Sequence, residues 1–395
     1  MYPDHPLELW NEAAAHALLG AALPNSAVIT FDEDGGGLRR REFGIGSWGI
    51  AWVEGGRAVT YGYDLDRSTA RDQLPPVDLL AGAPDWFPWE HVHAAQKEMD
   101  LVSWVYWWDG TTWARPEYPG DMDGGPDSGN DQSFDGYADN AEDWDAAREP
   151  YDALLAAVEA RVVDAAVIEA LYAPLDETCR PSAPAAAVAG ALELARRLGV
   201  TPGAPRPELP AGTGEPAGRR VHVLDGHQVE GAIAKAMRNA SELDRPAPST
   251  EPDEVAAWVR ANLGEAAVEI AWTGSDRPGH GYKLGIERGR MADAGLSALL
   301  DAWREREADP ERGRWTHARV VVTASGFTAD RAYDHLPAWW TGFQLYLAGL
   351  RAEMASRAPR WRPSWAGLLD QELWSQGVPP ELAWRPGEPF QSLAL

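Results

Sequence analysis

Several features that are common in proteins are missing or scarce in this chain of 395 residues. It has one cysteine, Cys179, which excludes an internal disulfide and a cysteine-based metal cluster. No run approaches the ~20 uninterrupted apolar residues of a membrane helix. The first residues lack the basic start and the apolar core of a signal peptide. We therefore expect a soluble protein of the reducing cytoplasm.

Positive charge is also scarce. The chain carries 35 Lys and Arg residues against 61 Asp and Glu residues, a net charge of −26. Residues 1–150 hold 28 acids and 9 bases, so they account for −19 of that total. A chain this negative repels phosphate backbones and anionic membranes. This argues against nucleic-acid and membrane binding, and it favours a protein partner with a basic surface.

Tryptophan is abundant, and its distribution indicates the domain organisation. Ten of the 20 tryptophans precede residue 145 and the other ten follow residue 257. Because large aromatic side chains fill cores and anchor interfaces, we predict an α+β fold with two Trp-rich modules, mainly antiparallel sheets and an Ala-rich helical connector. The predicted segments are a module at 1–120, an acidic loop at 121–145, the connector at 146–199, a Pro/Gly linker at 200–218 and a second module with C-terminal helices at 219–395.

Apolar periodicity and glycine turns predict the individual elements. In the front module they predict a helix at 7–20, a strand at 27–31, a helix start at 85–89, and hairpins at 48–53/57–63 and 103–108/112–118. Farther along they predict helices at 146–173, 184–198, 228–239, 252–263, 291–306, 339–358 and 365–376, strands at 221–224, 267–273 and 281–287, and a hairpin at 314–323/327–333.

Two patterns partly match metal sites. His91 and His93 are two residues apart in a segment that favours a helix, where side chains at that spacing point in different directions. The segment Asp121-x-Asp123-Gly124-Gly125-x-Asp127 is similar to a calcium loop, but Gln132 stands where an EF-hand needs glutamate. From Glu117 to Glu149 a single base accompanies eleven acids, which favours a solvated loop or a docking loop for a basic partner. We expect no metal and no other cofactor.

Catalytic patterns are weak. There is no Gly-x-Ser-x-Gly elbow, and Cys179 lies in the predicted connector. His317, Asp334 and His335 form a conceivable acid–base group, but Asp334 is more simply the N-cap of a helix beginning near Pro337. The run Trp104-Val105-Tyr106-Trp107-Trp108 has two interpretations, core packing or a ligand platform, and the first is favoured.

The C-terminal region resembles a known family. It runs helix, two strands, amphipathic helix and hairpin, with Trp315-Thr316, the strand 319–323, Phe327 and Tyr333-Asp334. In these residues it resembles the YezG-like immunity proteins of bacterial polymorphic toxin systems over about 90 residues. The front module resembles actinobacterial proteins of no defined activity. The resemblance implies a cytoplasmic protein that binds and neutralises a toxin, often a nuclease.

Charge and resemblance together give the functional hypothesis. We expect the acidic loop to dock on a basic toxin, with aromatic anchors nearby. The expected partner-binding residues are Trp104, Trp107, Trp108, Asp121, Asp123, Asp127, Asp131 and Asp135. Two alternatives stay open: a hydrolase of sugars or esters with scattered carboxylates, and a non-catalytic scaffold.

Overall fold

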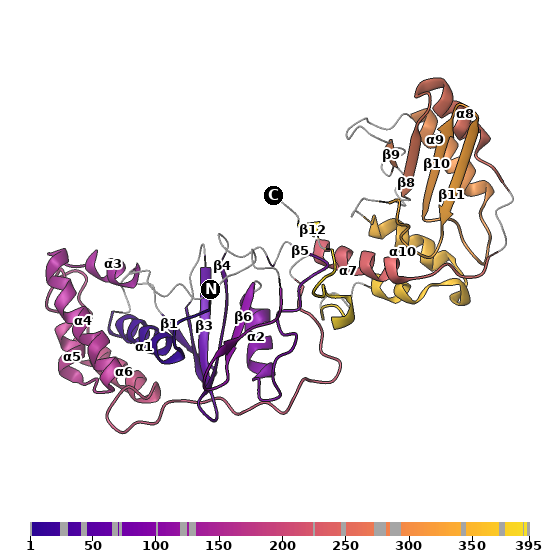
Figure 1. Cartoon of the computed structure of the whole chain (residues 1–395). Coiled ribbons are helices and arrows are strands. Elements are labelled where there is room, and N and C mark those ends of the chain that lie inside the picture. Colours follow the sequence, from indigo (N-terminus) through magenta and orange to yellow (C-terminus); the bar gives the residue numbers. More distant parts are fainter. Residues whose placement is uncertain are drawn as a thin grey trace. The chain divides into compact units, whose positions relative to one another are not determined.

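The protein is described from a computed structural model of the whole chain (Figure 1). It divides into two compact units, unit 1 with residues 1–72, 77–224 and 385–388, and unit 2 with residues 73–76, 225–384 and 389–395. Both units combine helices with antiparallel sheet, so the predicted α+β class is confirmed. The structure describes residues 2–23, 31–40, 46–64, 70, 73–99, 102–118, 125, 132–223, 226–245, 250–271, 282–284, 294–340, 345–370, 376–389 and 391–392.

Unit 1 is built on a six-stranded antiparallel sheet. Its order is β1 (Phe31–Asp34), β2 (Gly37–Arg40), β3 (Gly46–Val53), β4 (Arg57–Asp64), β6 (Trp104–Trp108) and β7 (Trp113–Ala114). Both predicted hairpins are present, although the second strand of the latter is two residues long and not the predicted 112–118. Their turns contain Gly55, Gly56 and Gly110 at positive φ, a conformation that glycine adopts without steric cost. The predicted strand at 27–31 lies outside the described residues except for Phe31, where β1 begins.

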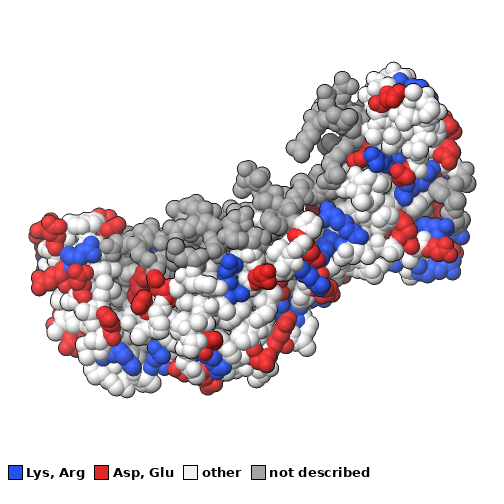
Figure 2. All heavy atoms as spheres, viewed as in Figure 1, with Lys and Arg blue, Asp and Glu red and all other residues white. Residues whose placement is uncertain are grey.

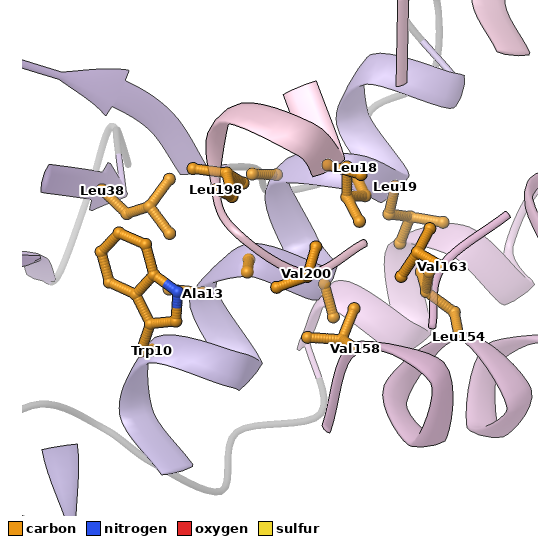
Figure 3. Packing of buried hydrophobic residues seen from close by; sticks show 14 of the residues in the cluster. Trp10, Ala13, Leu18, Leu19, Leu38, Leu154, Val158, Val163, Leu198 and Val200 are labelled. Carbon is orange, nitrogen blue, oxygen red and sulfur yellow. The ribbon is translucent and has the colours of Figure 1, made fainter. Parts of the chain in front are cut away.

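Alternation along the strands gives the sheet two buried faces. On one face Trp104 and Tyr106 join the core cluster that also contains α1 (Pro6–Ala22). Figure 3 shows part of this cluster, with Trp10 of α1 beside Leu38 of β2. On the opposite face Trp107 packs edge-on against Phe87, 5.8 Å between ring centroids, just before α2 (Trp89–Met99). Helices therefore cover both sides of the sheet (Figure 1).

The helices α4 (Trp144–Ala160), α5 (Ala165–Ala170) and α6 (Pro184–Arg197) complete the core on the α1 side. A single helix over 146–173 was predicted, and this is wrong. Arg161 adopts a left-handed conformation, φ 58°, and ends α4. The predicted connector at 146–199 is also corrected, because these helices share one hydrophobic cluster with α1 and belong to unit 1.

A short helix, α3 (Gln132–Ala138), lies in the segment predicted to be an acidic loop. Phe134 and Tyr137, three residues apart, both pack on Tyr151 of α4, with ring centroids 5.2 and 6.3 Å away. Packing of these two aromatic side chains on one face stabilises the helix. The prediction of a loop was based on the acidic composition of the segment and overlooked this aromatic pair.

The segment 200–218 is not a free linker between units. Leu209 is buried, donates its N–H to the Trp52 carbonyl at 2.7 Å and accepts from the N–H of Glu54 at 2.9 Å. Three residues later, the N–H of Gly212 donates to the Trp86 carbonyl at 2.9 Å. The segment is thus bonded to the framework of unit 1, and its Pro and Gly residues shape a wall of that unit.

Unit 2 contains a four-stranded antiparallel sheet in the order β11 (Gly326–Ala332), β10 (His317–Thr323), β8 (Ala267–Ala271) and β9 (Tyr282–Leu284). The hairpin of β10 and β11 was predicted and is confirmed. The helices α8 (Asp253–Asn262) and α9 (Ala294–Arg306) pack on the sheet, where Val255, Leu300 and Val320 belong to one apolar cluster.

Unit 2 also contains α7 (Gly226–Asn239), α10 (Leu347–Ser356) and the 3₁₀ turns η3 (Pro359–Trp361), η4 (Ser364–Leu369) and η5 (Pro380–Leu382). The helix predicted at 339–358 is shorter, because α10 begins only after Tyr346, whose φ is 49°. Of the helix predicted at 365–376, residues 365–369 belong to the 3₁₀ turn η4, and residues 371–375 lie outside the described residues. Of the strand predicted at 221–224, the described residues 221–223 show a single bridge at Val221.

Unit 2 also takes up a piece of the front half of the chain. β5 (Gln73–Leu74) pairs with β12 (Gln391–Ser392) near the C-terminus. Leu74 lies against Gly231 of α7, where an added Cβ would meet Leu74 Cδ2 at 3.0 Å. Residues 73–76 therefore fold with a segment more than 150 positions away in the sequence, although their neighbours belong to unit 1.

Candidate functional site

The structure places the predicted partner-binding residues in three different environments. Trp104 and Trp107 are 0% and 6% exposed and pack inside unit 1, so core packing is confirmed and they do not form surface anchors. Trp108 is partly buried, with its ring against His5 and Trp113. Asp135 is exposed on α3. The remaining four, Asp121, Asp123, Asp127 and Asp131, lie outside the described residues.

Asp135 is one of a group of carboxylates on α3, α4 and the turn between them. All seven are exposed: Asp135, Asp139, Glu142, Asp143, Asp145, Glu149 and Asp152. We call these residues the α3–α4 acidic surface. Figure 2 shows acidic side chains gathered over the end of unit 1 where α3 and α4 lie, whereas acids and bases are interspersed over unit 2.

The α3–α4 acidic surface carries little compensating charge. Its one base, Arg148, lies over the ring of Phe134, 3.4 Å from the ring centroid. Within the part of the chain that the structure describes, no ion pair joins any of the seven carboxylates to a Lys or Arg. Only Asp143 has a clear structural task, because its side chain caps α4 by accepting the N–H of Asp145 at 3.0 Å.

An exposed tryptophan lies in the middle of this surface. Trp144, the first residue of α4, is 44% exposed and rests edge-on against Phe134, 5.5 Å between ring centroids. It is absent from the residues predicted to bind a partner, although the pattern Glu142-Asp143-Trp144-Asp145 contains a signal. Carboxylates are seldom buried without a partner, so a tryptophan with carboxylates directly on both sides belongs to a segment that favours the surface.

The support beneath this surface is rigid and aromatic. Tyr151 of α4 contacts Phe134 and Tyr137 and hydrogen-bonds through its hydroxyl to His16 Nε2 of α1 at 2.9 Å. Burial lowers the pKa of His16 to about 4, so the imidazole is neutral at pH 7. The acidic residues are therefore presented by helices fixed to the core of unit 1.

A cavity of about 540 Å³ lies elsewhere in unit 1, between the start of α2 and residues 209–216. Trp89, Glu90 and His91 line it. His91 Nε2 is 3.0 Å from the Tyr61 hydroxyl, whereas burial and Lys97 lower the pKa of His93, which hydrogen-bonds to Gln96. The two imidazoles thus have different partners. Among the described residues, no three His, Cys, Asp or Glu side chains are grouped to hold a metal ion.

The candidate acid–base residues of unit 2 are bound to other groups. Asp334 is fully buried and accepts from Arg245 Nη2 and Arg357 Nη1, each at 2.8 Å, so its predicted role as a helix N-cap is wrong. His335 Nδ1 lies 2.8 Å from Glu242 Oε1. His317 is buried against Trp340, and burial lowers its pKa to about 3.

Asp334 is part of a buried network of ion pairs. Glu353, 1% exposed, accepts from Arg304 Nη2 at 2.8 Å and from Arg357 Nε at 3.0 Å. Burial by itself raises the pKa of this carboxyl, but the charge of Arg304 and the other donors outweigh it, and the pKa lies below its ordinary value. Each carboxylate is saturated with guanidinium donors, which suits a structural role that fixes the packing of α9 and α10.

Comparison with known proteins gives no family assignment, since no protein-family model, curated protein or solved structure matches the chain. Of the helices described here, none combines the length and the apolar character that crossing a bilayer requires. The α3–α4 acidic surface with Trp144 is thus the candidate functional site of unit 1.

Proposed function

We propose that this chain is an immunity-type protein that binds and blocks a basic toxin, such as a nuclease, through the α3–α4 acidic surface. The observation that supports the proposal is the gathering of seven exposed carboxylates on α3, α4 and their connecting turn, with no ion pair to a described Lys or Arg. Solubility alone requires charge of either sign anywhere on the surface, and it does not require that acids gather on one pair of helices.

Electrostatics gives such a surface a function in recognition. A nuclease is positively charged where it holds phosphate, and an acidic protein of complementary shape can cover those groups. Opposite potentials increase the rate of encounter by about 10- to 1000-fold at low salt. Because the carboxylates are exposed, the effect is screened when the Debye length falls from ~10 Å at 0.1 M salt to ~3 Å at 1 M.

Trp144 supplies an apolar contact that the charged residues of this surface do not provide. Tryptophan is enriched among the residues that dominate binding energies, because it removes a large area from water and loses little side-chain entropy. The side chain of Trp144 is 44% exposed and is held from one side by Phe134. We therefore assign Trp144 as the apolar anchor and the surrounding carboxylates as the steering and rim groups.

The test uses the full chain and the purified product of a toxin gene adjacent to its own. Association rates are measured at about 50 mM and 500 mM salt. Replacement of Asp139→Asn, Glu142→Gln and Asp145→Asn together is expected to slow association ~10-fold at low salt and much less at high salt. Trp144→Ala is expected to weaken binding by about 2 kcal/mol, or ~30-fold, mainly through faster dissociation.

The matched control neutralises three exposed carboxylates of unit 2, Glu251→Gln, Glu265→Gln and Asp330→Asn. It changes the net charge by the same amount and is expected to leave the association rate within ~2-fold of the wild type. Equal slowing by both triple variants would show that net charge acts without a specific surface. If the first triple variant and Trp144→Ala both neutralise the toxin as well as the wild type does, the proposal is refuted.

A further inference from the structure

A second cavity of unit 1, of about 590 Å³, opens where the first turns of α1, the end of α4 and residues 199–208 meet. This volume is in the range of small-molecule sites. Its lining includes Leu7 and Trp10 from α1, Glu159 and Arg161 from the end of α4, and Arg206 and Glu208. One wall is therefore apolar, and the rest holds two bases and two acids.

Arg206 is fixed in place and forms no direct ion pair with an acid of the described chain. Its guanidinium lies over the ring of Trp52, 3.4 Å from the ring centroid. Its Nε is buried, and among the described residues no hydrogen-bond acceptor reaches that atom. Burial lowers the pKa of Arg206, the negative charge of Glu208 acts in the opposite direction, and the positive charge of Arg161 lowers the pKa further. A desolvated cation next to a second cation is stabilised by an anion that binds between them.

Arg161, the second cation of the cavity, is held in place by its backbone conformation and by hydrogen bonds to carbonyl groups. Its backbone is left-handed, φ 58°, a conformation that costs a residue with a Cβ about 1 kcal/mol or more. The side chain donates through Nε to the Gly199 carbonyl at 2.7 Å and through Nη2 to the Ala204 carbonyl. These bonds tie the segment before Arg206 to the end of α4, and they leave Nη1 without a hydrogen bond to the described residues.

The acids of the cavity are exposed and have no ion pair within the described chain. Glu159 and Glu208 are both exposed, and neither lies within ion-pair distance of Arg161 or Arg206. The charge of Glu208 does act on Arg206, although the two side chains are not in contact. Two cations and two anions thus line the same cavity without neutralising each other directly.

We propose that this cavity binds a small zwitterion of the amino-acid or short-peptide class. The carboxylate accepts from the guanidinium groups of Arg206 and Arg161, in the bidentate manner that suits a planar guanidinium. The ammonium group binds Glu208 and Glu159, and the remaining part of the ligand lies along Leu7 and Trp10. The site is separate from the α3–α4 acidic surface, and it does not depend on the function proposed for that surface.

Isothermal titration of the full chain tests this site with two arms, the free amino acids and a set of dipeptides. Binding in either arm supports the proposal and identifies the class. For each binder, the methyl ester removes the carboxylate charge and the N-acetyl derivative removes the ammonium group. Each derivative is expected to bind ~10- to 100-fold more weakly, the effect of losing one charged hydrogen-bond partner.

Two variants locate the binding. Arg206→Gln is expected to weaken binding of the zwitterion ~10- to 100-fold but to leave the affinity for its methyl ester nearly unchanged. Glu208→Gln changes an exposed position where folding is not at risk. This variant is expected to weaken binding of the zwitterion but not binding of its N-acetyl derivative. The control is Arg196→Gln on α6, where the exposed arginine pairs with Glu193 of the same helix.

The proposal is overturned if neither arm gives binding heat, if ester and zwitterion bind alike, or if Glu208→Gln binds as the wild type does. Equal loss in Arg206→Gln and Arg196→Gln would also overturn it. Thermal unfolding of each variant separates loss of binding from loss of structure, and the pairing of Glu208→Gln with the N-acetyl derivative gives a result even where Arg206→Gln is unstable.

Discussion

The buried imidazole of His317 makes the stability of unit 2 depend on pH. His317 is 1% exposed, its Nδ1 lies 3.1 Å from the Thr316 hydroxyl, and burial lowers its pKa to about 3. In the unfolded chain the same group titrates near 6.5. Between these two pKa values the unfolded state binds a proton that the folded state does not, so stability falls as pH falls below about 6.5.

The size of the effect follows from the two pKa values. At pH 4.5 an unfolded histidine is almost fully protonated, whereas folded His317 is almost fully neutral. The linkage relation then gives a loss of about 3 kcal/mol between pH 8 and pH 4.5 from this one group. Asp334 and Glu353 have lowered pKa values and contribute stability that begins to be lost only as the pH falls toward their unfolded pKa values of about 4. The chosen window therefore excludes most of their contribution.

Urea unfolding with pulsed hydrogen exchange measures this loss, because peptides from β10 and β11 report on unit 2 alone. His317→Gln, which does not titrate, is expected to reduce the loss of unfolding free energy between pH 8 and pH 4.5 by about 3 kcal/mol. The control Val320→Ala removes buried methyl groups from the same strand and is expected to lower stability equally at every pH. A wild-type pH dependence in His317→Gln would refute the reasoning.

Four further substitutions test the framework by denaturant unfolding. Glu353→Ala removes the carboxylate that accepts from the buried guanidiniums of Arg304 and Arg357, and it is expected to cost unit 2 about 3–5 kcal/mol; a loss under 1 kcal/mol would contradict this. Asp143→Ala removes the N-cap of α4 and is expected to cost about 1 kcal/mol, and an unchanged midpoint would argue against it. Gly212→Ala places a Cβ against the Phe87 carbonyl oxygen and is expected to lower the free energy of unfolding of unit 1 by about 1–3 kcal/mol. Its control is Gly190→Ala on α6, where an added Cβ meets no neighbour, and this change is expected to raise the free energy of unfolding by ~0.5–1 kcal/mol.

The sequence predicted the elements that local chemistry determines. The hairpins at Gly55-Gly56 and Gly110 follow from glycine's freedom at positive φ, and the amphipathic helix α9 follows from its apolar spacing. These features depend on a few neighbouring residues. They need no knowledge of what packs against them, and for this reason they could be predicted.

Other features depend on partners far away in the sequence, and they were missed. Arg161 ends α4 in a conformation usually left to glycine, since its guanidinium finds carbonyls at Gly199 and Ala204. Asp334 was predicted as a cap because its sequence neighbours suggest one, but Arg245 and Arg357 come from distant segments to bind it. Local patterns contain no information about such pairings.

The candidate site was predicted only in outline. The excess of acid in the front part indicated residues 117–149, and Asp135 is indeed exposed there. The aromatic anchors were expected from the wrong tryptophans, because strand alternation in a sheet with helices on both faces buries both Trp104 and Trp107. An exposed tryptophan at a helix start, Trp144, needed the structure to be recognised.

The pairing of β5 with β12 determines how the gene can be divided. Because Gln73 and Leu74 belong to unit 2, a chain cut after residue 224 would separate them from α7 and β12. A fragment that starts at residue 225 would lack the leucine that lies over Gly231 and would expose an unpaired strand edge. Neither half is then a complete folding unit, and a peptide covering β5 becomes the natural means of complementing the C-terminal fragment in trans.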